Sequence, residues 1–283
     1  MISDSESIDT LIELAITEDL GSGDHTSMAT IPHTSYGKAK LLIKEAGIIA
    51  GISVAHKVFS KIDPEIVFYP IIADGSKVNS GDIGFYVEGK SISLLSAERL
   101  ALNFLQRMSG IATKTNQLVQ LLDGLQTKLL DTRKTTPNMR IFEKEAVRLG
   151  GGHNHRFGLF DMILIKNNHI DFAGGVTKAL FACRKYLEMN ELNLKIEIEV
   201  RDFDELSEAL VTGGFQRIML DNFTVDQMQK AISLIEGRFE TEASGGITEA
   251  TLRAYAETGV DFISVGALTH HIKSLDMSLR AMV

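Results

Sequence analysis

The second half of this sequence predicts an α/β fold built on a parallel sheet. Apolar, β-prone runs alternate there with helical patterns, which is the order that successive βαβ units produce. Six runs are clear, at residues 128–130, 162–165, 196–200, 217–220, 240–243 and 262–265. Helical patterns lie between them at residues 173–187, 204–210, 224–235 and 248–257.

The runs end at regular intervals, on residue types that can do chemistry. The ends are Arg133, Lys166, Glu199, Asp221, Ser244 and Gly266, and the gaps between them are 33, 33, 22, 23 and 22 residues. Such steps suit one strand, one helix and two loops, as in an α/β barrel, where the carboxyl ends of the strands converge on one mouth. Six strands are fewer than the regular eight, so a doubly wound sheet remains the structural alternative.

The first half predicts a smaller, mixed region. Residues 8–20 form an amphipathic helical pattern, and residues 18–27 (EDLGSGDHTS) break it with turn-forming residues. Asp24 and His25 are metal-ligand types, but without further ligands nearby a capping loop explains them better. Strand patterns follow at residues 40–44, 47–50, 67–72 and 83–87, with a helix at 53–62. Residues 94–122 predict two helices, broken near Ser109–Gly110.

Composition excludes several classes of protein. The 283 residues carry a net charge of −8, which argues against broad nucleic-acid binding. No apolar run approaches the roughly 18 residues that a membrane helix needs, and the acidic start is unlike a signal peptide. The single Cys183 excludes an internal disulfide and a multi-cysteine zinc site, and it fits a reducing compartment. We therefore expect a cytoplasmic protein without a membrane partner.

Cations gather in residues 131–170. Seven Lys or Arg residues against four acids give 7 − 4 = +3 there, and three of the eight histidines lie in the same stretch. An acidic protein that concentrates cations in one segment is usually building an anion site. A solvated helix face is the alternative, and it suits residues 143–148, where acids and bases alternate. It does not suit Arg133, Lys134 or Lys166, which follow apolar strands.

The later strand ends add glycines and acids to the predicted mouth. Ser244-Gly245-Gly246 and Gly266-Ala267 would let backbone N–H groups approach phosphate oxygens. Glu197 and Glu199 lie on one face of their strand, so spacing alone does not choose between them. With Asp221, such an acid could hold Mg²⁺, bind sugar hydroxyls or stabilise developing positive charge.

Several motifs, taken together and in order, resemble the quinolinate phosphoribosyltransferase family over essentially the whole chain. They are EDLGSGDHTS, AERLALNFLQRMSGIAT, DTRKTTP, GGGHNHRFGLFDMILIKNNH, IEIEV, IMLDN, EASGGI and ISVGALTH. The resemblance implies an N-terminal α/β sandwich domain at residues 1–108 and an incomplete α/β barrel at 109–270, with a C-terminal helix at 271–283. It also implies a homodimer that converts quinolinate and phosphoribosyl pyrophosphate to nicotinate mononucleotide, pyrophosphate and carbon dioxide, with Mg²⁺ bound mainly through phosphoribosyl pyrophosphate.

The resemblance also implies roles for individual residues. Arg133, His155 and Arg156 would hold quinolinate, together with Arg99 from the neighbouring subunit. The catalytic group would be Lys134, Lys166, Glu199 and Asp221, of which the lysines face substrate anions and the acids lie near the ribose and the metal. The remaining substrate contacts would be Thr132, Ser244, Gly245, Gly246, Gly266 and His270, with the 5′-phosphate at the glycines and pyrophosphate near His270.

Two positions depart from the family pattern. Asn138 replaces the usual glycine after TTP, and asparagine tolerates the positive φ such a turn needs. Asn167 replaces the acid that commonly follows the lysine of LIK, which removes one negative charge near Lys166. Two rival functions remain open from the residues, a Schiff-base lyase using Lys166 and a non-catalytic anion-binding paralogue.

Overall fold

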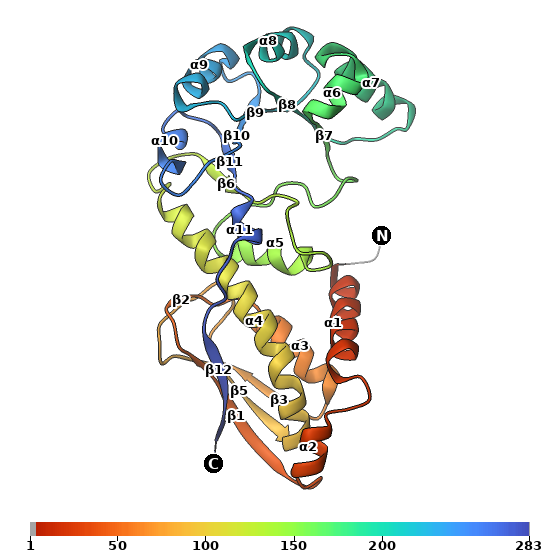
Figure 1. Ribbon diagram of the computed structural model, residues 1–283, viewed down its shortest axis with the longest axis vertical. Coiled ribbons are helices and arrows are strands. Elements are labelled where there is room, and N and C mark those ends of the chain that lie inside the picture. The colour runs from red at the N-terminus through yellow and green to blue at the C-terminus, as the bar shows by residue number, and fades with distance from the viewer. Residues whose placement is uncertain (1–3, 283) are drawn as a thin grey trace. The chain divides into compact units, whose positions relative to one another are not determined.

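The computed structural model describes residues 4–282, which form two compact units (Figure 1). The first unit contains residues 1–116, 135–151 and 268–283, and the second contains residues 117–134 and 152–267. The sequence division at residue 108 therefore differs from the structure, because residues 135–151 cluster with the N-terminal segment. Residues 1–3 of the predicted first domain lie outside the described part.

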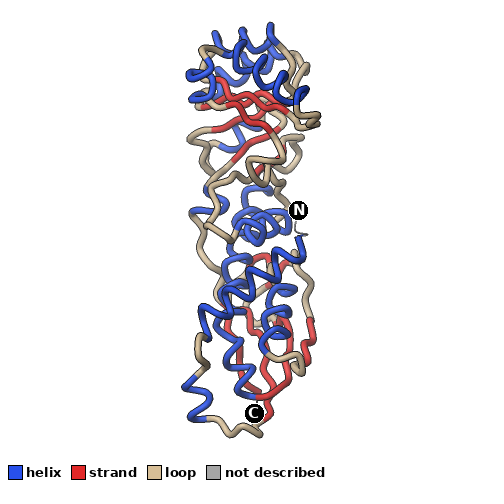
Figure 2. Tube along the Cα trace, turned by 90° about the vertical axis from the view of Figure 1, so that its right-hand side faces the viewer, coloured by secondary structure: helices blue, strands red, loops and turns tan. Residues whose placement is uncertain are grey.

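The first unit is built on an antiparallel sheet of four strands, ordered β12-β1-β5-β3 and drawn red with the other strands in Figure 2. These strands are β1 (Tyr36–Ile43), β3 (Val67–Pro70), β5 (Ile83–Lys90) and β12 (Met277–Met282). A short pair, β2 (Gly47–Ile48) and β4 (Lys77–Val78), forms a separate ribbon. The predicted strands of residues 37–89 are thus confirmed, with bounds shifted by a few residues.

Five helices complete the first unit: α1 (Asp4–Leu20), α2 (His25–Thr30), α3 (Ile52–Ile62), α4 (Ser91–Gln120) and α5 (Arg140–Leu149). The Asp24 carboxylate accepts from the Ser27 N–H at 3.0 Å and caps α2, as the loop interpretation predicts. Phe59 of α3 and Phe68 and Phe85 of the sheet pack in tilted and edge-on pairs with ring centroids 4.4–6.0 Å apart. Phe59 and Phe85 are fully buried, so this cluster anchors an apolar core.

Helix α4 runs unbroken through Ser109 and Gly110, so the predicted break is wrong. The Ser109 hydroxyl lies on the buried face, where it bonds the N–H and C=O of Ala50 at 2.9 and 3.1 Å. A Cβ on Gly110 would approach the Lys273 carbonyl oxygen to 2.3 Å. Ser109 and Gly110 therefore let neighbouring segments pack closely against α4, and they do not end the helix.

The C-terminal segment is a strand, and the predicted helix at 271–283 is wrong. Strand β12 pairs antiparallel with β1, with Leu279 opposite Leu41 and Met277 opposite Ile43. Met277, Leu279 and Ala281 alternate with Ser278 and Arg280, which is the two-residue period of a β-strand. The edge of β1 that does not pair with β5 is available to this strand. Residue 283 lies outside the described part.

The second unit is built on a parallel sheet of six strands, in the order β6-β11-β10-β9-β8-β7. They are β6 (Lys128–Leu130), β7 (Ile163–Ile165), β8 (Ile196–Val200), β9 (Arg217–Asp221), β10 (Glu240–Ser244) and β11 (Phe262–Ser264). All six predicted strands are present. Neighbouring strands follow chain order from β7 to β11, without the reversal of a doubly wound sheet, which favours the barrel over that alternative.

The helices of the second unit are α6 (Asn167–Ala173), α7 (Val176–Met189), α8 (Phe203–Thr212), α9 (Val225–Ile235) and α10 (Leu252–Ala256); the short α11 (Ala267–His270) follows the last strand. Helices α7 to α10 lie along the outer side of the sheet in Figure 1. Met228, Ala231 and Ile235 of α9, spaced three and four apart, are fully buried. Among residues 4–282, no helix is long and apolar enough to cross a membrane.

Candidate active site

Strand register brings the carboxyl ends of the parallel sheet together in the second unit. Asp221 pairs with Ser244 across β9 and β10, and Glu199 pairs with Met219 across β8 and β9. Alternation then places Glu197 and Glu199 on the same face as Met219, Asp221 and Ser244. The strand ends that recur at regular intervals in the sequence therefore lie together at one edge of the sheet.

A cavity of about 300 Å³ opens at this mouth. Its lining contains residues from the loop after β6, from the segment before β7 and from four strands. The lining residues are Thr132, Arg133, Lys134, His155, Arg156, Leu164, Lys166, Met219, Glu242, Ser244 and Ser264. Seven of the predicted site residues therefore meet in one cavity of the second unit.

The buried Asp131 organises the loop that carries the first two cations. Its Oδ1 accepts from the His155 N–H at 2.8 Å, and its own N–H donates to the His153 carbonyl at 3.1 Å. The Lys134 N–H donates to the Thr132 hydroxyl at 3.1 Å and turns the loop. Arg133 and Lys134 follow directly and are exposed at the mouth.

Arg156 adds a third cation to the cavity wall. Its guanidinium donates to the Met162 carbonyl at 3.2 Å. Partial burial, and then repulsion from the Arg133 guanidinium, lower the pKa of Arg156. Two guanidinium groups that repel each other across a cavity bind a planar carboxylate well, because each offers a two-pronged donor and the anion removes the repulsion.

Lys166 also lines the cavity, and two acids lie close to it at the strand ends. The Lys166 ammonium lies 3.0 Å from Glu199 Oε2, and Glu199 is only 5% exposed. Partial burial, and then the charge of Glu199, raise the pKa of Asp221. The Lys166 nitrogen is held in an ion pair with Glu199, so it is not placed to attack a carbonyl, and this argues against the Schiff-base alternative.

The Glu199 and Asp221 carboxylates also fit a divalent cation. They are hard oxygen ligands at one mouth, and repulsion from Glu199 helps, after partial burial, to raise the pKa of Asp221. A bound Mg²⁺ would relieve that repulsion, and it would need few protein ligands if substrate phosphates supplied the others. The donor set of the chain is therefore compatible with Mg²⁺.

The loop after β10 is shaped by a residue that the sequence did not single out. Asn222 has a φ of 57°, and its side-chain amide donates to Asp221 Oδ2 at 2.9 Å. Its N–H donates to the Ser244 carbonyl at 2.8 Å. Gly245 has a φ of 91°, and a Cβ there would lie 2.3 Å from the Asn222 side-chain oxygen. Gly245 therefore lets the acid and the glycine loop lie together.

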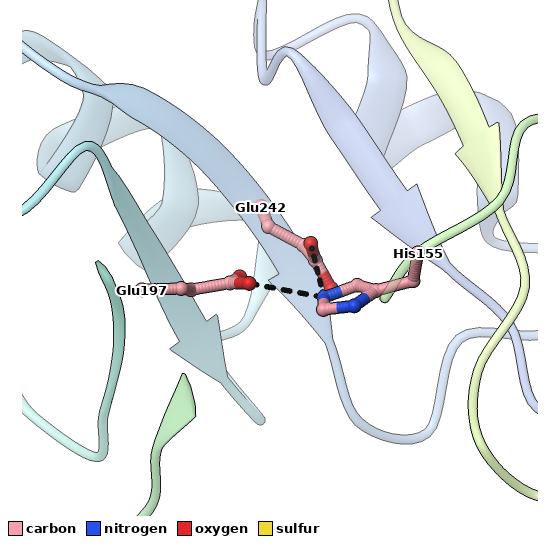
Figure 3. A group of neighbouring side chains, drawn as sticks. All are labelled: His155, Glu197 and Glu242. Carbon is pink, nitrogen blue, oxygen red and sulfur yellow. Dashed lines mark ion pairs between the residues drawn. The ribbon is translucent and has the colours of Figure 1, made fainter. Parts of the chain in front are cut away.

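Below the cavity, buried acids converge on one histidine (Figure 3). His155 Nε2 lies 3.0 Å from Glu197 Oε2 and 3.4 Å from Glu242 Oε2. Glu197 and Glu242 are 0% exposed, and Arg217 approaches Glu242 Oε2 at 3.3 Å from the neighbouring strand. Burial alone lowers the pKa of His155, but Glu197 and Glu242 outweigh it and raise that pKa to about 9. Burial and the charge of Glu242 raise the pKa of Glu197 to about 7.

Three ligand atoms of this cluster lie close enough to hold a metal ion, within 4.8 Å of one another. The backbone N–H of Arg156, however, donates to His155 Nδ1 at 2.7 Å. Nδ1 therefore carries a lone pair, and the ring hydrogen lies on Nε2, facing the carboxylates. A metal on Nε2 would need the opposite tautomer, so we assign the cluster to a proton and not to a metal.

Two predicted residues belong to the first unit. Arg99 is exposed on α4, and among residues 4–282 its side chain has no hydrogen bond or ion pair, so the ion pair with a surface neighbour that its position beside Glu98 also suggested is not seen. His270 is exposed at the end of α11, with its Nδ1 2.6 Å from that of His271. Gly246 and Gly266 lie in the loops directly after β10 and β11.

Asn138 and Asn167, the two departures from the family pattern, both fit the local backbone. Asn138 has a φ of 63°, so the turn survives as expected. Asn167 is the first residue of α6, and its side-chain oxygen accepts from the Asn168 N–H at 2.8 Å.

Glu242, Arg217, Met219 and Ser264 are the site residues that sequence reasoning did not name. A signal existed for Glu242, because it stands two positions before Ser244 on a predicted strand and must share its face. Spacing alone did not choose between Glu197 and Glu199 as the acid at the mouth. Contacts resolve this choice, because Glu197 approaches His155 whereas Glu199 approaches Lys166. Arg217 is the first residue of β9, and no pattern in the sequence places it beside a buried acid.

Comparison with protein families finds two matches that cover most of the chain. The model described as Quinolinate phosphoribosyl transferase, N-terminal domain, matches residues 24–109. The model described as Quinolinate phosphoribosyl transferase, C-terminal domain, matches residues 111–280.

Curated relatives and solved structures point to the same family. Quinolinate phosphoribosyltransferase (decarboxylating) 1 of Nicotiana glauca is 46% identical over 285 residues, covering 95% of this chain and 81% of the relative. A probable nicotinate-nucleotide pyrophosphorylase (carboxylating) of Bacillus subtilis is 43% identical, with coverage of 93% and 89%. The structure of the nicotinate-nucleotide pyrophosphorylase from Francisella tularensis superposes with a TM-score of 0.92 at 40% identity, covering 100% of this chain and 98% of that one.

Proposed function

This chain belongs to the quinolinate phosphoribosyltransferase family and is a decarboxylating enzyme of NAD biosynthesis, and we propose how the residues of its cavity perform that reaction. The observation that carries the proposal is the cavity itself. Arg133, Arg156 and Lys166 line one side of it, and a carboxylate pair and a glycine loop lie beside them at the strand ends.

The acceptor is quinolinate, and Arg133 and Arg156 bind its two carboxylates. Partial burial first and repulsion from Arg133 second lower the pKa of Arg156, and a bound carboxylate would offset both, which supports this assignment. A monoanionic pyridine would leave one of these cations without its carboxylate. That loss costs on the order of 2–5 kcal/mol when a charge pair is broken in a partly buried site.

The donor is phosphoribosyl pyrophosphate. Ser244, Gly245 and Gly246 receive its 5′-phosphate through backbone N–H groups, and Lys134 faces its anionic groups as a point charge. Glu199 and Asp221 would hold Mg²⁺ together with the substrate phosphates. The ion would neutralise charge on the leaving pyrophosphate.

Displacement of pyrophosphate leaves positive charge on the ribose carbon as the bond breaks. Fixed carboxylates at Glu199 and Asp221 stabilise that charge more in the transition state than in the ground state. Lys166 holds Glu199 in place through the 3.0 Å ion pair. The acceptor nitrogen becomes cationic on attack, and the ring then stabilises the electron pair left by carbon dioxide, so decarboxylation needs no separate cofactor.

An activity assay tests the reaction and the acceptor together. Purified protein with quinolinate, phosphoribosyl pyrophosphate and Mg²⁺ should form nicotinate mononucleotide and release carbon dioxide and pyrophosphate. Nicotinate, as the control acceptor, should give a much lower kcat/KM. Comparable values for the two acids would overturn the assignment of two carboxylate-binding arginines.

We further propose that the enzyme is a homodimer in which Arg99 completes the neighbouring subunit's acceptor site. The exposed position of Arg99 on α4 and its lack of a side-chain partner in residues 4–282 support this. Arg99→Ala and Lys134→Ala should each be inactive alone. In a mixed dimer one site collects both defects and the other collects neither, so subunit exchange should restore up to roughly a quarter of wild-type activity.

Recovery should follow the heterodimer population measured by native mass spectrometry. Heterodimers without recovered activity would mean that Arg99 acts within its own chain. We propose a cytoplasmic location, which the single cysteine supports, although relatives in plants include chloroplastic and mitochondrial forms.

A further inference from the structure

Asn222 has a left-handed backbone conformation that no helix end explains. Among residues 4–282, the non-glycine residues with positive φ are Asn138, Glu191, Asn222 and Glu236. Glu191 and Glu236 lie just beyond α7 and α9, where a left-handed residue commonly ends a helix. Asn222 instead follows β9 directly, beside Asp221, with a φ of 57°. Left-handed residues of this kind cluster at functional sites, where the surrounding structure holds them in place.

Asn222 contacts two different parts of the candidate site. Its N–H donates to the Ser244 carbonyl at 2.8 Å, which joins the ends of β9 and β10. Its side-chain amide donates to Asp221 Oδ2 at 2.9 Å. A Cβ on Gly245 would lie 2.6 Å from Asn222 Cγ, so only a glycine leaves room for the amide there. The Asn222 side chain therefore packs against both the Asp221 carboxylate and the backbone of the glycine loop.

A neutral donor suits the contact with Asp221. The amide binds one oxygen of the carboxylate and leaves the other, Oδ1, for the ribose. A cation in the same place would cancel part of the negative charge that the acid supplies to the reaction, whereas an amide leaves that charge intact. Because charge stabilisation in a transition state depends on groups that are already oriented, fixing the carboxylate contributes to the rate.

We propose that Asn222 is a positioning residue that couples the glycine loop to Asp221. The Ser244 and Gly245 backbone holds Asn222, and Asn222 holds the Asp221 carboxylate in the orientation that stabilises charge on the ribose. The inference rests on the proposed function, because it takes the glycine loop and Asp221 as parts of the phosphoribosyl pyrophosphate site. Asn222 acts through Asp221, so its loss should lower kcat and weaken the donor site without changing the acceptor site.

Two substitutions separate the amide from the backbone and from the space it fills. Asn222→Gly keeps the left-handed backbone and removes the amide. Asn222→Asp keeps the size and replaces the donor with a second carboxylate, which repels Asp221. Asn138→Gly is the matched control, since it makes the same exchange at a φ of 63°, on an exposed residue where the family pattern has glycine.

Steady-state kinetics and calorimetric binding of each substrate measure the effect. Asn222→Gly should lower kcat roughly ten- to a hundredfold, the scale on which a misplaced group costs activity. Asn222→Asp should lower kcat at least as far. Both variants should raise the KM for phosphoribosyl pyrophosphate, and their KM for quinolinate should stay within about twofold of wild type. Asn138→Gly should match the wild type in every parameter.

A double-mutant cycle distinguishes positioning from a structural role. In the Asp221→Ala background, Asn222→Gly should change kcat by less than about twofold, because the group through which it acts is already gone. Losses that multiply in the double variant would show that Asn222 acts on the substrate or on the loop directly, and would overturn the inference. An Asn222→Asp variant as active as the wild type would overturn it as well.

Other outcomes concern the proposed function itself. If the wild type does not bind phosphoribosyl pyrophosphate in calorimetry with Mg²⁺, the donor assignment fails and this inference fails with it. If the wild type binds the donor and both Asn222 variants keep their kcat, this inference alone fails. Denaturant unfolding identifies loss of folding, and Asn222→Asp still decides the question if Asn222→Gly does not fold, because it fills the same volume.

Discussion

The two sheets of this protein bury opposite kinds of side chain. In the first unit the sheet packs Phe85 against Phe59 and Phe68, and the buried residues of its four strands are apolar. In the second unit the inner face of the parallel sheet buries Glu197 and Glu242 at 0% exposure. Apolar burial stabilises a fold at roughly 25 cal/mol per Å², whereas burial of charge costs free energy unless partners offset it.

This difference shows where the molecule gives up stability for function. The charged inner face lies directly below the cavity, and its acids are arranged around a histidine and an arginine and not around apolar groups. The outer face of the same sheet is covered by the apolar faces of helices such as α9. In the second unit the inner face of the sheet therefore carries the charged groups of the site, and the outer face carries the apolar packing that stabilises the fold. The sheet of the first unit contributes only apolar packing.

The largest expected effect is on the apolar side of this comparison. Phe85→Ala should lower the free energy of unfolding by about 3–5 kcal/mol, because it removes a buried aromatic ring and leaves a cavity. The kcat of the remaining folded enzyme should stay close to wild type. Phe172→Ala on α6 is the control, since that ring is 93% exposed and its loss should change stability by less than about 0.5 kcal/mol. Equal destabilisation by the two variants would contradict the assignment of the core.

Substitution of the acids at the mouth should lower activity and leave stability nearly unchanged. Glu199→Ala or Asp221→Ala should lower kcat roughly 10²–10³-fold, the scale for removing one group that stabilises transition-state charge. The binding of quinolinate and the free energy of unfolding should change much less. Steady-state kinetics with calorimetric binding would check this. A defect confined to the KM for quinolinate would show that these acids bind the acceptor and do not act on the ribose.

The buried acid Glu197 should make stability depend on pH. Its pKa in the folded protein is raised from 4.5 to about 7, so the folded state binds more protons than the unfolded state between these values. Stability is therefore fully present at the acid end and falls as pH rises through about 7, by on the order of 3 kcal/mol at most.

Denaturant unfolding of wild type and Glu197→Gln across pH 5–8 isolates this contribution. The difference in free energy of unfolding should shift in favour of the glutamine variant as pH rises. A difference that is constant with pH would mean that Glu197 is ionised in both states.

The smallest expected effect separates two neighbouring glycines. Gly245→Ala and Gly246→Ala both place a side chain at positive φ, which costs roughly 1–2 kcal/mol. Only Gly245→Ala also drives a Cβ to 2.3 Å from Asn222, whereas nothing lies within 4 Å of a Cβ at Gly246. Gly245→Ala should therefore raise the KM for phosphoribosyl pyrophosphate more than Gly246→Ala. The opposite order would show that Asn222 moves aside freely.

Much of the second unit could be predicted from the sequence, because its information is local. A parallel strand buried on both faces appears as a short apolar run, and the chain then needs a helix to return, so residues 162–165 (MILI) were recognisable by composition and their neighbours by spacing. The residues that end these strands were predictable for the same reason. Lys166, Glu199, Asp221 and Ser244 follow apolar runs at fixed steps, and parallel strands deliver their ends to one edge.

Other features depended on contacts between segments far apart in the chain. Gly110 has the local character of a helix breaker, and only the backbone of Lys273 explains why α4 continues through it. The segment 277–282 could have been a helix or a strand, and the free edge of β1 decided the outcome. In both cases tertiary packing outweighed a weak local propensity.

The sequence by itself determined the fold class, the family and the strand ends that surround the cavity, because periodicity and motif order are properties of the chain alone. Only the tertiary structure decided that Glu197 and Glu242 meet His155, that Arg217 balances Glu242, and that Asn222 supports Asp221. Those pairings depend on the register between strands that are about twenty or more residues apart, and on atoms placed to within an ångström. Free energies of burial and proton binding depend on such distances, which no residue pattern specifies.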